Sequence, residues 1–395
     1  MTEAAGTPFP GRRFRLVEPE VAKDPGAYFD TLRSTCPVAR STDFGGFWVL
    51  STHSDVHEAC LAPEVFSSAG PINIPAIPQP PVICIEQDDP EHRKYRKPMQ
   101  GWFSAKRVQG LEDQVRTIVA DCIDRVLADG EGDLGAILAA PVPPTVIALV
   151  LGLPEQDWEW FRERETTLIA HAQVGDSEAA APVYREIADY LSAHIGDRRT
   201  APRADMLTDI AQLTIDGSPV PHEDAVGLAF LILGAGHETT VGGIGGMLYQ
   251  VLKDTRVRDQ LVADPSRAEI AVEEALRLEA PLLGLARTLA GTATMRGVDM
   301  SEGDRVMLLF GAANRDDAVF ESPEDFRLDR TNVQKHLAFG AGVHRCVGAP
   351  LARLEMRIVL EEVLTRMPGV RLTDPDSVSV RWTVGREFSN LHASW

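Results

Sequence analysis

A cysteine in a glycine-rich loop is the residue best placed to do chemistry. The segment FGAGVHRCVG, residues 339–348, carries three glycines around Cys346 and leads directly into a predicted helix. A thiol at a helix N-terminus beside His344 and Arg345 should have its thiolate favoured by the helix dipole and by positive neighbours. Glycines also leave backbone N–H groups free to point at the sulfur, and such donors tune metal–thiolate bonds. Cys346 is therefore a candidate metal ligand.

Other kinds of site fit this loop less well. Structural zinc is disfavoured because no second cysteine pair lies nearby. A dinucleotide site is disfavoured because the third glycine position of the fingerprint is occupied by Arg345, and no strand–turn–helix crossover follows. The other cysteines lack comparable surroundings and are expected to fill the core; they are Cys36, Cys60, Cys84 and Cys122.

A second candidate site interrupts a long apolar segment, residues 225–252. At its centre AGHETT, residues 235–240, places Glu238 and two hydroxyls where a carboxylate is costly unless it is paired, hydrated or used. Gly234 and Gly236 each lower helix stability by about 1 kcal/mol relative to alanine, so they let a group approach the backbone or let the helix bulge. A helix crossing with a satisfied glutamate explains this segment alone equally well.

The elements that must position these residues are mostly helices. The apolar segment predicts a buried helix over 225–252, roughly 42 Å long. Further helices are predicted across 105–199, around residues 273–277, and from about 347 to 367, where Pro368-Gly369 ends the helix. Strands are predicted at 306–310, at 378–384 and in a hairpin around residues 43–46. The sequence predicts a mainly α fold with small peripheral β-sheets, as one domain over residues 1–395.

Composition narrows the class of protein. The chain has 395 residues, 44% of them apolar, and a net charge of −19, which argues against disorder and against a nucleic-acid partner. Five scattered cysteines fit a reducing compartment, and residues 1–14 resemble neither a signal peptide nor an anchor. Residues 134–154 carry no charge, but prolines at 141, 143 and 144 predict two short buried segments instead of a membrane span. We expect a soluble, cytoplasmic protein with no membrane partner.

Three motifs in this order resemble the cytochrome P450 haem-thiolate monooxygenases in their soluble bacterial form. They are AGHETT, the ExxR pair Glu274–Arg277, and FGAGVHRCVG, and the resemblance covers essentially the whole chain. It implies haem b as cofactor, and a long central helix that crosses over the haem. By position, Cys346 resembles the axial ligand of the haem iron, with Phe339 and Gly340 in the same loop.

The resemblance also implies roles for other residues. Glu238 and Thr239 resemble the acid–alcohol pair that delivers protons to dioxygen, with room for dioxygen left at Ala235 and Gly236; His237 receives no role. Four side chains resemble the clamp for the haem propionates: His92, Arg96, Arg287 and His344. Three resemble the family's structural ion-pair network: Glu274, Arg277 and Arg330.

Electrons and substrate must come from outside the chain. No flavin or iron–sulfur domain is fused on, so the resemblance implies a separate ferredoxin with its NAD(P)H-dependent reductase, and a monomeric enzyme. Six cations form a candidate docking patch, unless they are ordinary surface charge; they are Arg93, Lys94, Lys97, Arg345, Arg353 and Arg357.

The predicted substrate pocket is drawn from variable segments, including residues 71–78. Its candidates are apolar except for one asparagine: Ile72, Asn73, Ile74, Phe230, Leu231, Leu282, Leu283, Leu285 and Phe388. A pocket without charge favours a compact hydrophobe, such as a terpenoid or an aromatic compound. Two other functions remain open: a hydroxylase driven by hydrogen peroxide, and a haem-binding sensor without turnover. Glu238 and Thr239 count against both, because neither function depends on an acid–alcohol pair.

Overall fold

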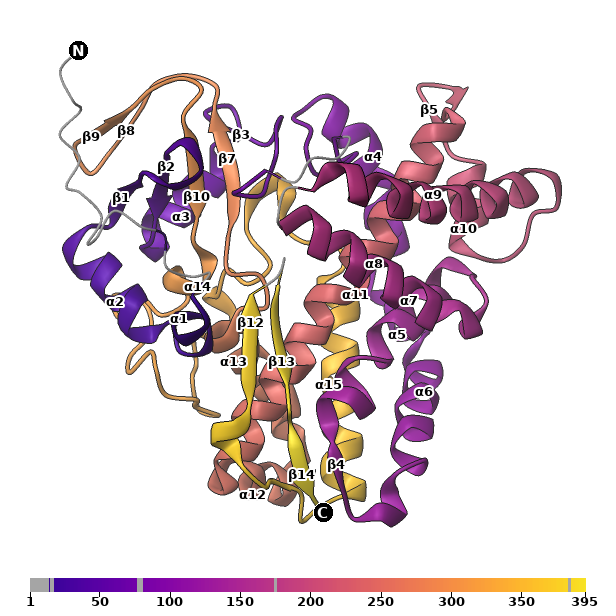
Figure 1. Cartoon of the computed structure of the whole chain (residues 1–395), viewed down its shortest axis with the longest axis vertical. Coiled ribbons are helices and arrows are strands. Elements are labelled where there is room, and N and C mark those ends of the chain that lie inside the picture. Colours follow the sequence, from indigo (N-terminus) through magenta and orange to yellow (C-terminus); the bar gives the residue numbers. More distant parts are fainter. Residues whose placement is uncertain (1–13, 15–17, 77–80, 174–175, 383–384) are drawn as a thin grey trace.

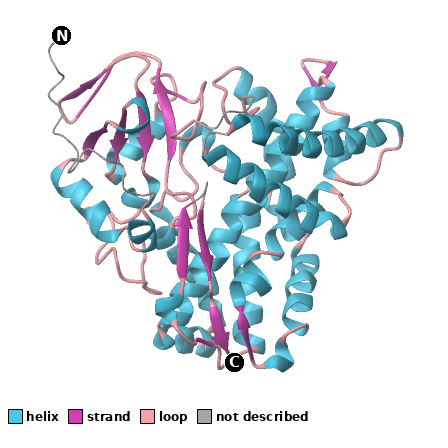
Figure 2. Cartoon of the chain, viewed as in Figure 1, coloured by secondary structure: helices cyan, strands magenta, loops and turns pink. Residues whose placement is uncertain are grey.

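The computed structural model describes residues 14, 18–76, 81–173, 176–382 and 385–395. Helices dominate and the strands form small sheets near the periphery, as predicted (Figures 1 and 2). The α-helices are α1 (Pro19–Lys23), α2 (Gly26–Thr35), α3 (His53–Leu61), α4 (Glu91–Trp102), α5 (Ala105–Gln109), α6 (Glu112–Asp124), α7 (Val142–Leu151), α8 (Trp158–Gln173), α9 (Ser177–Thr200), α10 (Met206–Ala211), α11 (His222–Lys253), α12 (Thr255–Ala263), α13 (Ala268–Glu279), α14 (Phe310–Ala313) and α15 (Ala349–Arg366).

The strands are short. They are β1 (Val38–Ser41), β2 (Phe47–Leu50), β3 (Phe66–Ser67), β4 (Glu131–Asp133), β5 (Thr214–Ile215), β6 (Ser218–Pro219), β7 (Leu285–Leu289), β8 (Ala293–Met295), β9 (Val298–Met300), β10 (Arg305–Leu308), β11 (Arg371–Leu372), β12 (Ser379–Trp382), β13 (Arg386–Ser389) and β14 (His392–Ser394).

The largest sheet has the strand order β1-β2-β10-β7-β3. The predicted hairpin is confirmed, since β1 pairs antiparallel with β2, with Ser41 opposite Phe47. The predicted strand at 306–310 is shorter than expected, because Phe310 already begins α14. This sheet joins segments from both halves of the chain, while the prediction of one domain over residues 1–395 stays a prediction. The predicted strand at 378–384 is β12 as far as residue 382, and residues 383–384 lie outside the described residues.

The central helix α11 extends beyond its predicted ends, from His222 to Lys253. It is long and apolar enough to cross a membrane, yet half of its most apolar window is buried inside the protein. It packs against α7, α9, α13 and α15, as its position in Figure 1 shows. A Cβ at Gly242 would lie only 2.2 Å from the carbonyl oxygen of Arg386, so glycine is what allows β13 to approach the helix. Such contacts identify α11 as a core helix.

The uncharged segment 134–154 forms two buried pieces, as predicted. A short π-helical turn covers Gly135–Ala139, and α7 follows with Pro143 and Pro144 in its first turn, where proline is tolerated. The helix ends at Gly152, whose φ of +84° is left-handed. The prediction for the chain's first residues lies almost wholly outside the described residues.

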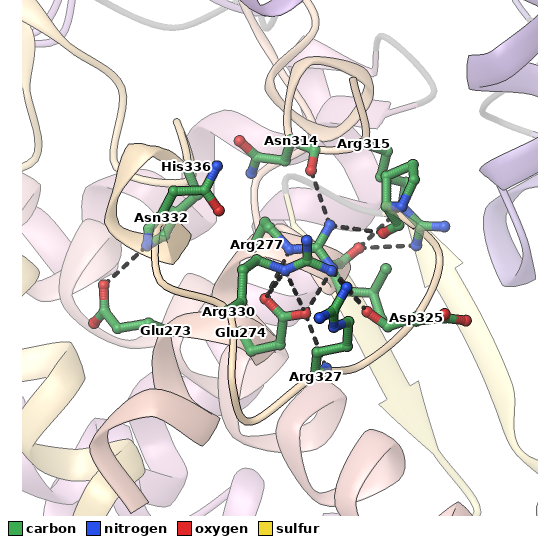
Figure 3. Close-up of polar contacts among 12 residues, drawn as sticks. Glu273, Glu274, Arg277, Asn314, Arg315, Asp325, Arg327, Arg330, Asn332 and His336 are labelled. Carbon is green, nitrogen blue, oxygen red and sulfur yellow. Dashed lines mark hydrogen bonds and ion pairs between the residues drawn. The ribbon is translucent and has the colours of Figure 1, made fainter. Parts of the chain in front are cut away.

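The ExxR pair is the centre of a buried polar network (Figure 3). Glu274 and Arg277 are fully buried, and two hydrogen bonds of 2.8 Å join them. Arg330 adds a bond of 3.0 Å to the same carboxylate, and Arg277 also donates to the carbonyl oxygens of Asn314 and Pro323. The network therefore ties α13 to the irregular segment that leads to the cysteine loop.

Removal of the negative charge of Glu274 should destabilise the fold. Glu274→Gln would leave two buried guanidinium groups without their counter-ion, which costs about 3–5 kcal/mol of unfolding free energy. Chemical denaturation should measure that loss. Arg327→Gln is the matched control, because its side chain pairs with Asp329 at the surface, and unfolding should be unchanged. A Glu274→Gln protein as stable as the control would contradict the structural role.

Candidate active site

One cavity of about 620 Å³ collects most of the predicted site residues. It lies among α4, α8, α11, α15, β7 and the cysteine loop, and its wall is largely apolar. The predicted cofactor and catalytic residues that line it are Arg96, Ala235, Gly236, Glu238, Thr239, Arg287, Phe339, Gly340, His344 and Cys346. The fold thus brings both motifs to one site. His92 is a predicted clamp residue that does not line the cavity itself.

Cys346 presents its sulfur to this cavity from the loop before α15. Its backbone N–H donates to the carbonyl oxygen of Phe339 at 2.8 Å, and the N–H groups of Gly348 and Ala349 donate to the sulfur. Cys346 is exposed to the cavity, yet desolvation by the surrounding protein raises the pKa of its thiol. Backbone donors and positive charges do favour the thiolate, as predicted, although the cations are Arg96 and Arg353; desolvation outweighs them in the protein alone. A bound cation is what would favour the thiolate further.

Two glycines of the loop have left-handed backbones for different reasons. Gly342 has a φ of +69°, and a Cβ there would lie 2.2 Å from the carbonyl oxygen of Cys60 in α3. Gly340 has a φ of +63°, but its nearest neighbour, the ring of Phe310, would lie 3.9 Å away. Gly342 therefore sets how closely the loop approaches α3, while Gly340 only meets a conformational need.

Three nitrogen-bearing side chains, Arg96, Arg287 and His344, lie at one wall of the cavity, and His92 lies behind them against His344. His92 and His344 lie with their ring centroids 4.2 Å apart, and the Nε2 atoms of both are buried without a partner among the described residues. Arg96 bonds the carbonyl oxygen of Arg345, yet its Nε is also unpartnered. Arg287 is 7% exposed and donates to the carbonyl oxygen of Ala286. The structure thus assembles the four clamp residues from three segments.

Burial disfavours positive charge at this wall. It lowers the pKa of His92, Arg96 and Arg287, and it lowers that of His344 to about 3, where His92 and Arg287 add repulsion. Buried donors without acceptors cost about 1–3 kcal/mol each. A ligand with two carboxylates would supply the missing acceptors, while Cys346 would supply one thiolate to a metal. These residues therefore fit haem. Among the described residues, no group of three His, Cys, Asp or Glu could hold a metal by itself.

One glycine on the α11 side of the site lets another helix approach closely, as predicted. A Cβ on Gly236 would lie 2.6 Å from the side chain of Ile147, so this glycine allows α7 to pack against α11 as well as opening the cavity wall. The Thr240 hydroxyl bonds the carbonyl oxygen of Gly236 at 3.5 Å. His237 forms a buried ion pair with Glu165 of α8, which lines the cavity; the sequence did not predict this contact.

Six of the nine predicted pocket residues line the cavity: Ile72, Asn73, Phe230, Leu231, Leu282 and Leu285. The other three pack elsewhere. Leu283 is buried in a cluster with Phe29 and Met307, Ile74 packs against that cluster, and Phe388 packs against Gly245 of α11. Residues 77 and 78 of the predicted segment lie outside the described residues.

The prediction of a charge-free pocket is wrong. Four carboxyl groups also line the cavity, those of Glu165, Glu223, Asp224 and Glu355. Glu355 is fully buried, its Oε2 has no partner among the described residues, and burial raises its pKa well above the ordinary value. Its spacing one turn after Leu351 on the buried face of α15 is a signal that could have identified it. Glu165 gave no such signal, because it ends a run of four charged residues, 162–165.

The two loop glycines should respond differently to alanine. Gly340→Ala should cost only the left-handed strain, about 1–2 kcal/mol. Gly342→Ala adds a collision with backbone, which cannot move aside, and should lower stability clearly more. Thermal unfolding of both variants measures the difference. Equal losses would show that the approach of the loop to α3 does not depend on Gly342.

The comparisons agree with this geometry. The sequence profile of the cytochrome P450 family matches residues 175–368. A steroid C26-monooxygenase of Mycobacterium tuberculosis is 36% identical over 90% of this chain and 89% of its own length. The mycinamicin IV hydroxylase/epoxidase of Micromonospora griseorubida is 34% identical over 76% of each chain.

Solved structures match over nearly the whole chain. The cytochrome P450 PksS of Bacillus subtilis superposes with a TM-score of 0.89 at 26% identity, covering 97% of this chain and 99% of its own. CYP108D1 of Novosphingobium aromaticivorans superposes with a TM-score of 0.85 at 30% identity, covering 96% and 98%. The predicted fold class is confirmed. This chain belongs to the cytochrome P450 family, and it is a monooxygenase that binds haem b.

Proposed function

We propose that this chain activates dioxygen with electrons from a separate ferredoxin and its NAD(P)H-dependent reductase, and hydroxylates a compact, mainly apolar substrate. The observation that carries the proposal is that one cavity brings together Cys346, two side chains (Arg96 and His344) that each have a nitrogen without a partner among the described residues, and the Glu238–Thr239 pair. A binding protein without turnover needs the first two groups only. The acid–alcohol pair at the same cavity supports catalysis.

Each group of residues has one task in this proposal. Cys346 would bind the haem iron, and His92, Arg96, Arg287 and His344 would hold the haem carboxylates. When bound, haem supplies the binding and reduction of dioxygen, and a thiolate ligand favours cleavage of the O–O bond. Phe339 and Gly340 form the wall of the cavity beside the sulfur.

Glu238 and Thr239 would handle protons. Both line the cavity from the middle of the buried helix α11, next to each other in the sequence, so that protons could pass between them. The Thr239 hydroxyl can donate a hydrogen bond toward the cavity. When its proton is passed on, a water molecule can supply another. The Glu238 carboxyl can alternate between its protonated and ionised forms, and thereby carry protons inward from solvent.

The cavity wall supports a neutral substrate. Apolar side chains dominate it, so a substrate carboxylate would be desolvated there at a high cost. Asn73 can orient one carbonyl or hydroxyl group. The names of similar proteins refer to a steroid, to mycinamicin and, for a Pseudomonas relative, to "terp". We infer a substrate of terpenoid, steroid or aromatic type.

The electron donor would meet the face that carries the cysteine loop. Four of the six predicted cations are engaged in ion pairs with acidic neighbours: Arg93, Lys94, Arg353 and Arg357. Lys97 and Arg345 make no ion pair within the described part of the chain. We also propose that the protein is a cytoplasmic monomer.

Loss of the Thr239 hydroxyl should uncouple electron use from product formation. In Thr239→Ala, haem content and substrate binding should persist, but electrons should appear as hydrogen peroxide because proton delivery is impaired. The assay compares NAD(P)H consumed with peroxide and product formed, in the presence of ferredoxin, reductase and dioxygen. Thr240→Ala is the matched control, since its hydroxyl is bound to the helix backbone. Unchanged coupling in Thr239→Ala would refute the assignment, and full activity on peroxide alone would favour the peroxide-driven alternative.

Loss of the Cys346 sulfur should abolish the haem-thiolate spectrum. Cys346→Ala should not give the red-shifted Soret band of the reduced carbon monoxide complex. Cys60→Ala should give that band, although Cys60 lines the same cavity and is a thiol as well. An unaltered spectrum in Cys346→Ala would overturn the ligand assignment.

A further inference from the structure

A buried ion pair joins α8 to α11 directly beside the acid–alcohol pair. The Nε2 atom of His237 contacts a carboxylate oxygen of Glu165, and the side chains are only 8% and 16% exposed. The Nδ1 atom of His237 lies 3.0 Å from the carbonyl oxygen of Leu233, one turn earlier on α11. Both nitrogens of the imidazole are therefore engaged, and the ring orientation is fixed.

The charges around His237 favour its cationic form. Burial alone would lower its pKa, but the Glu165 carboxylate, the hydrogen bond to the Leu233 carbonyl oxygen and, more weakly, Glu238 together raise the pKa to about 9. The ring contacts Glu165 of α8 and the Leu233 carbonyl oxygen of α11, and the charge of Glu238 acts on it from the next position of α11. At neutral pH the imidazolium and the Glu165 carboxylate neutralise each other inside the protein.

The ion pair lies where α8 forms part of the cavity wall. Glu165 and Leu168, one turn apart on α8, both line the cavity. A Cβ on Gly234 would lie 3.1 Å from the second oxygen of Glu165, so glycine at this position leaves the carboxylate its place against α11. On its other side α8 is joined to α9 by the ion pair of Arg164 with Glu186, at 2.8 Å. The contact with His237 thus fixes the cavity side of α8.

We propose that Glu165 and His237 are positioning residues, whose ion pair holds α8 against the cavity and holds the turn of α11 that carries Glu238 and Thr239. The part of the proposal that concerns Glu238 and Thr239 rests on the proposed function. The part that concerns α8 does not. Neither residue needs to touch the substrate to act in this way.

The raised pKa of His237 determines how the stability of its ion pair with Glu165 depends on pH. The pKa of His237 is higher in the folded protein than its ordinary value of about 6.5. The ion pair therefore contributes its full stabilisation of α8 below about pH 6.5. The stabilisation declines as pH rises, and it is lost above about pH 9. A structural contact without a titrating group would show no such step.

Hydrogen–deuterium exchange of the haem-loaded full chain tests the proposal. Glu165→Gln and His237→Gln should each speed exchange in α8 and in residues 233–240 by about tenfold or more, and the double variant should not exceed the single ones. Glu163→Gln is the matched control, because it removes the same charge from an exposed position of the same helix, and its exchange should match that of the natural chain. Exchange in Glu165→Gln equal to that in Glu163→Gln would overturn the proposal.

Hydrogen–deuterium exchange of the natural chain at several pH values tests the proposal even if a variant fails to fold. Exchange in α8, scaled to the intrinsic rate at each pH, should accelerate between pH 7 and about pH 10, and the step should be absent in folded Glu165→Gln. A flat profile in the natural chain would overturn the proposal. Exchange needs no turnover, so failure of the proposed function would appear separately, in the carbon monoxide spectrum and in product formation of the same samples.

Discussion

The burial of nitrogen atoms without partners in the described part of the chain is the constraint that explains the rest of the site. His92, Arg96 and His344 each keep one such nitrogen, in surroundings that disfavour their charged forms. At about 1–3 kcal/mol each, three such atoms amount to a large share of the stability of a typical domain. A ligand with carboxylates removes this penalty. Haem is therefore part of what stabilises the native fold, by the free energy of its binding.

Helix α11 has to satisfy two opposed demands. Its apolar faces form the core, and its glycines allow close approach, of α7 at Gly236 and of β13 at Gly242. The same middle turns must carry ionisable groups to the cavity. The side chains of these turns lie in different surroundings. Glu238 and Thr239 line the cavity, while His237 is buried and paired with a carboxylate from another helix. Three consecutive polar residues can thus occupy a buried helix without leaving an isolated charge.

Patterns that act within a few residues were readable from the sequence, and patterns set by packing were not. The hairpin at residues 38–50, the ends of α11 to within three residues, and the cysteine loop follow from turn residues, periodicity and glycine spacing. Phe388 was misplaced because its strand packs it against glycines of α11, which no local pattern reveals. Glu165 was missed because an exposed and a buried charge look alike within one run of charges. The effect of local charges on the Cys346 thiol was predicted in the right direction, but the larger effect of desolvation depends on packing and was missed.

Packing contacts that the sequence does not reveal also change the charge on the face where an electron donor would dock. Arg353 is held by Glu273 and lies over the Phe339 ring at 4.5 Å, so it supports the cysteine loop more than it adds free positive charge. Burial would raise the pKa of Glu273, but Arg353 and His336 outweigh it and lower that pKa to about 2. Arg357 is similarly engaged with Glu112 and Glu361. On a chain of net charge −19, long-range attraction of an acidic donor is therefore weak. Orientation of such a donor would then depend on short-range contacts, for which the exposed side chains of Lys97 and Arg345 are candidates.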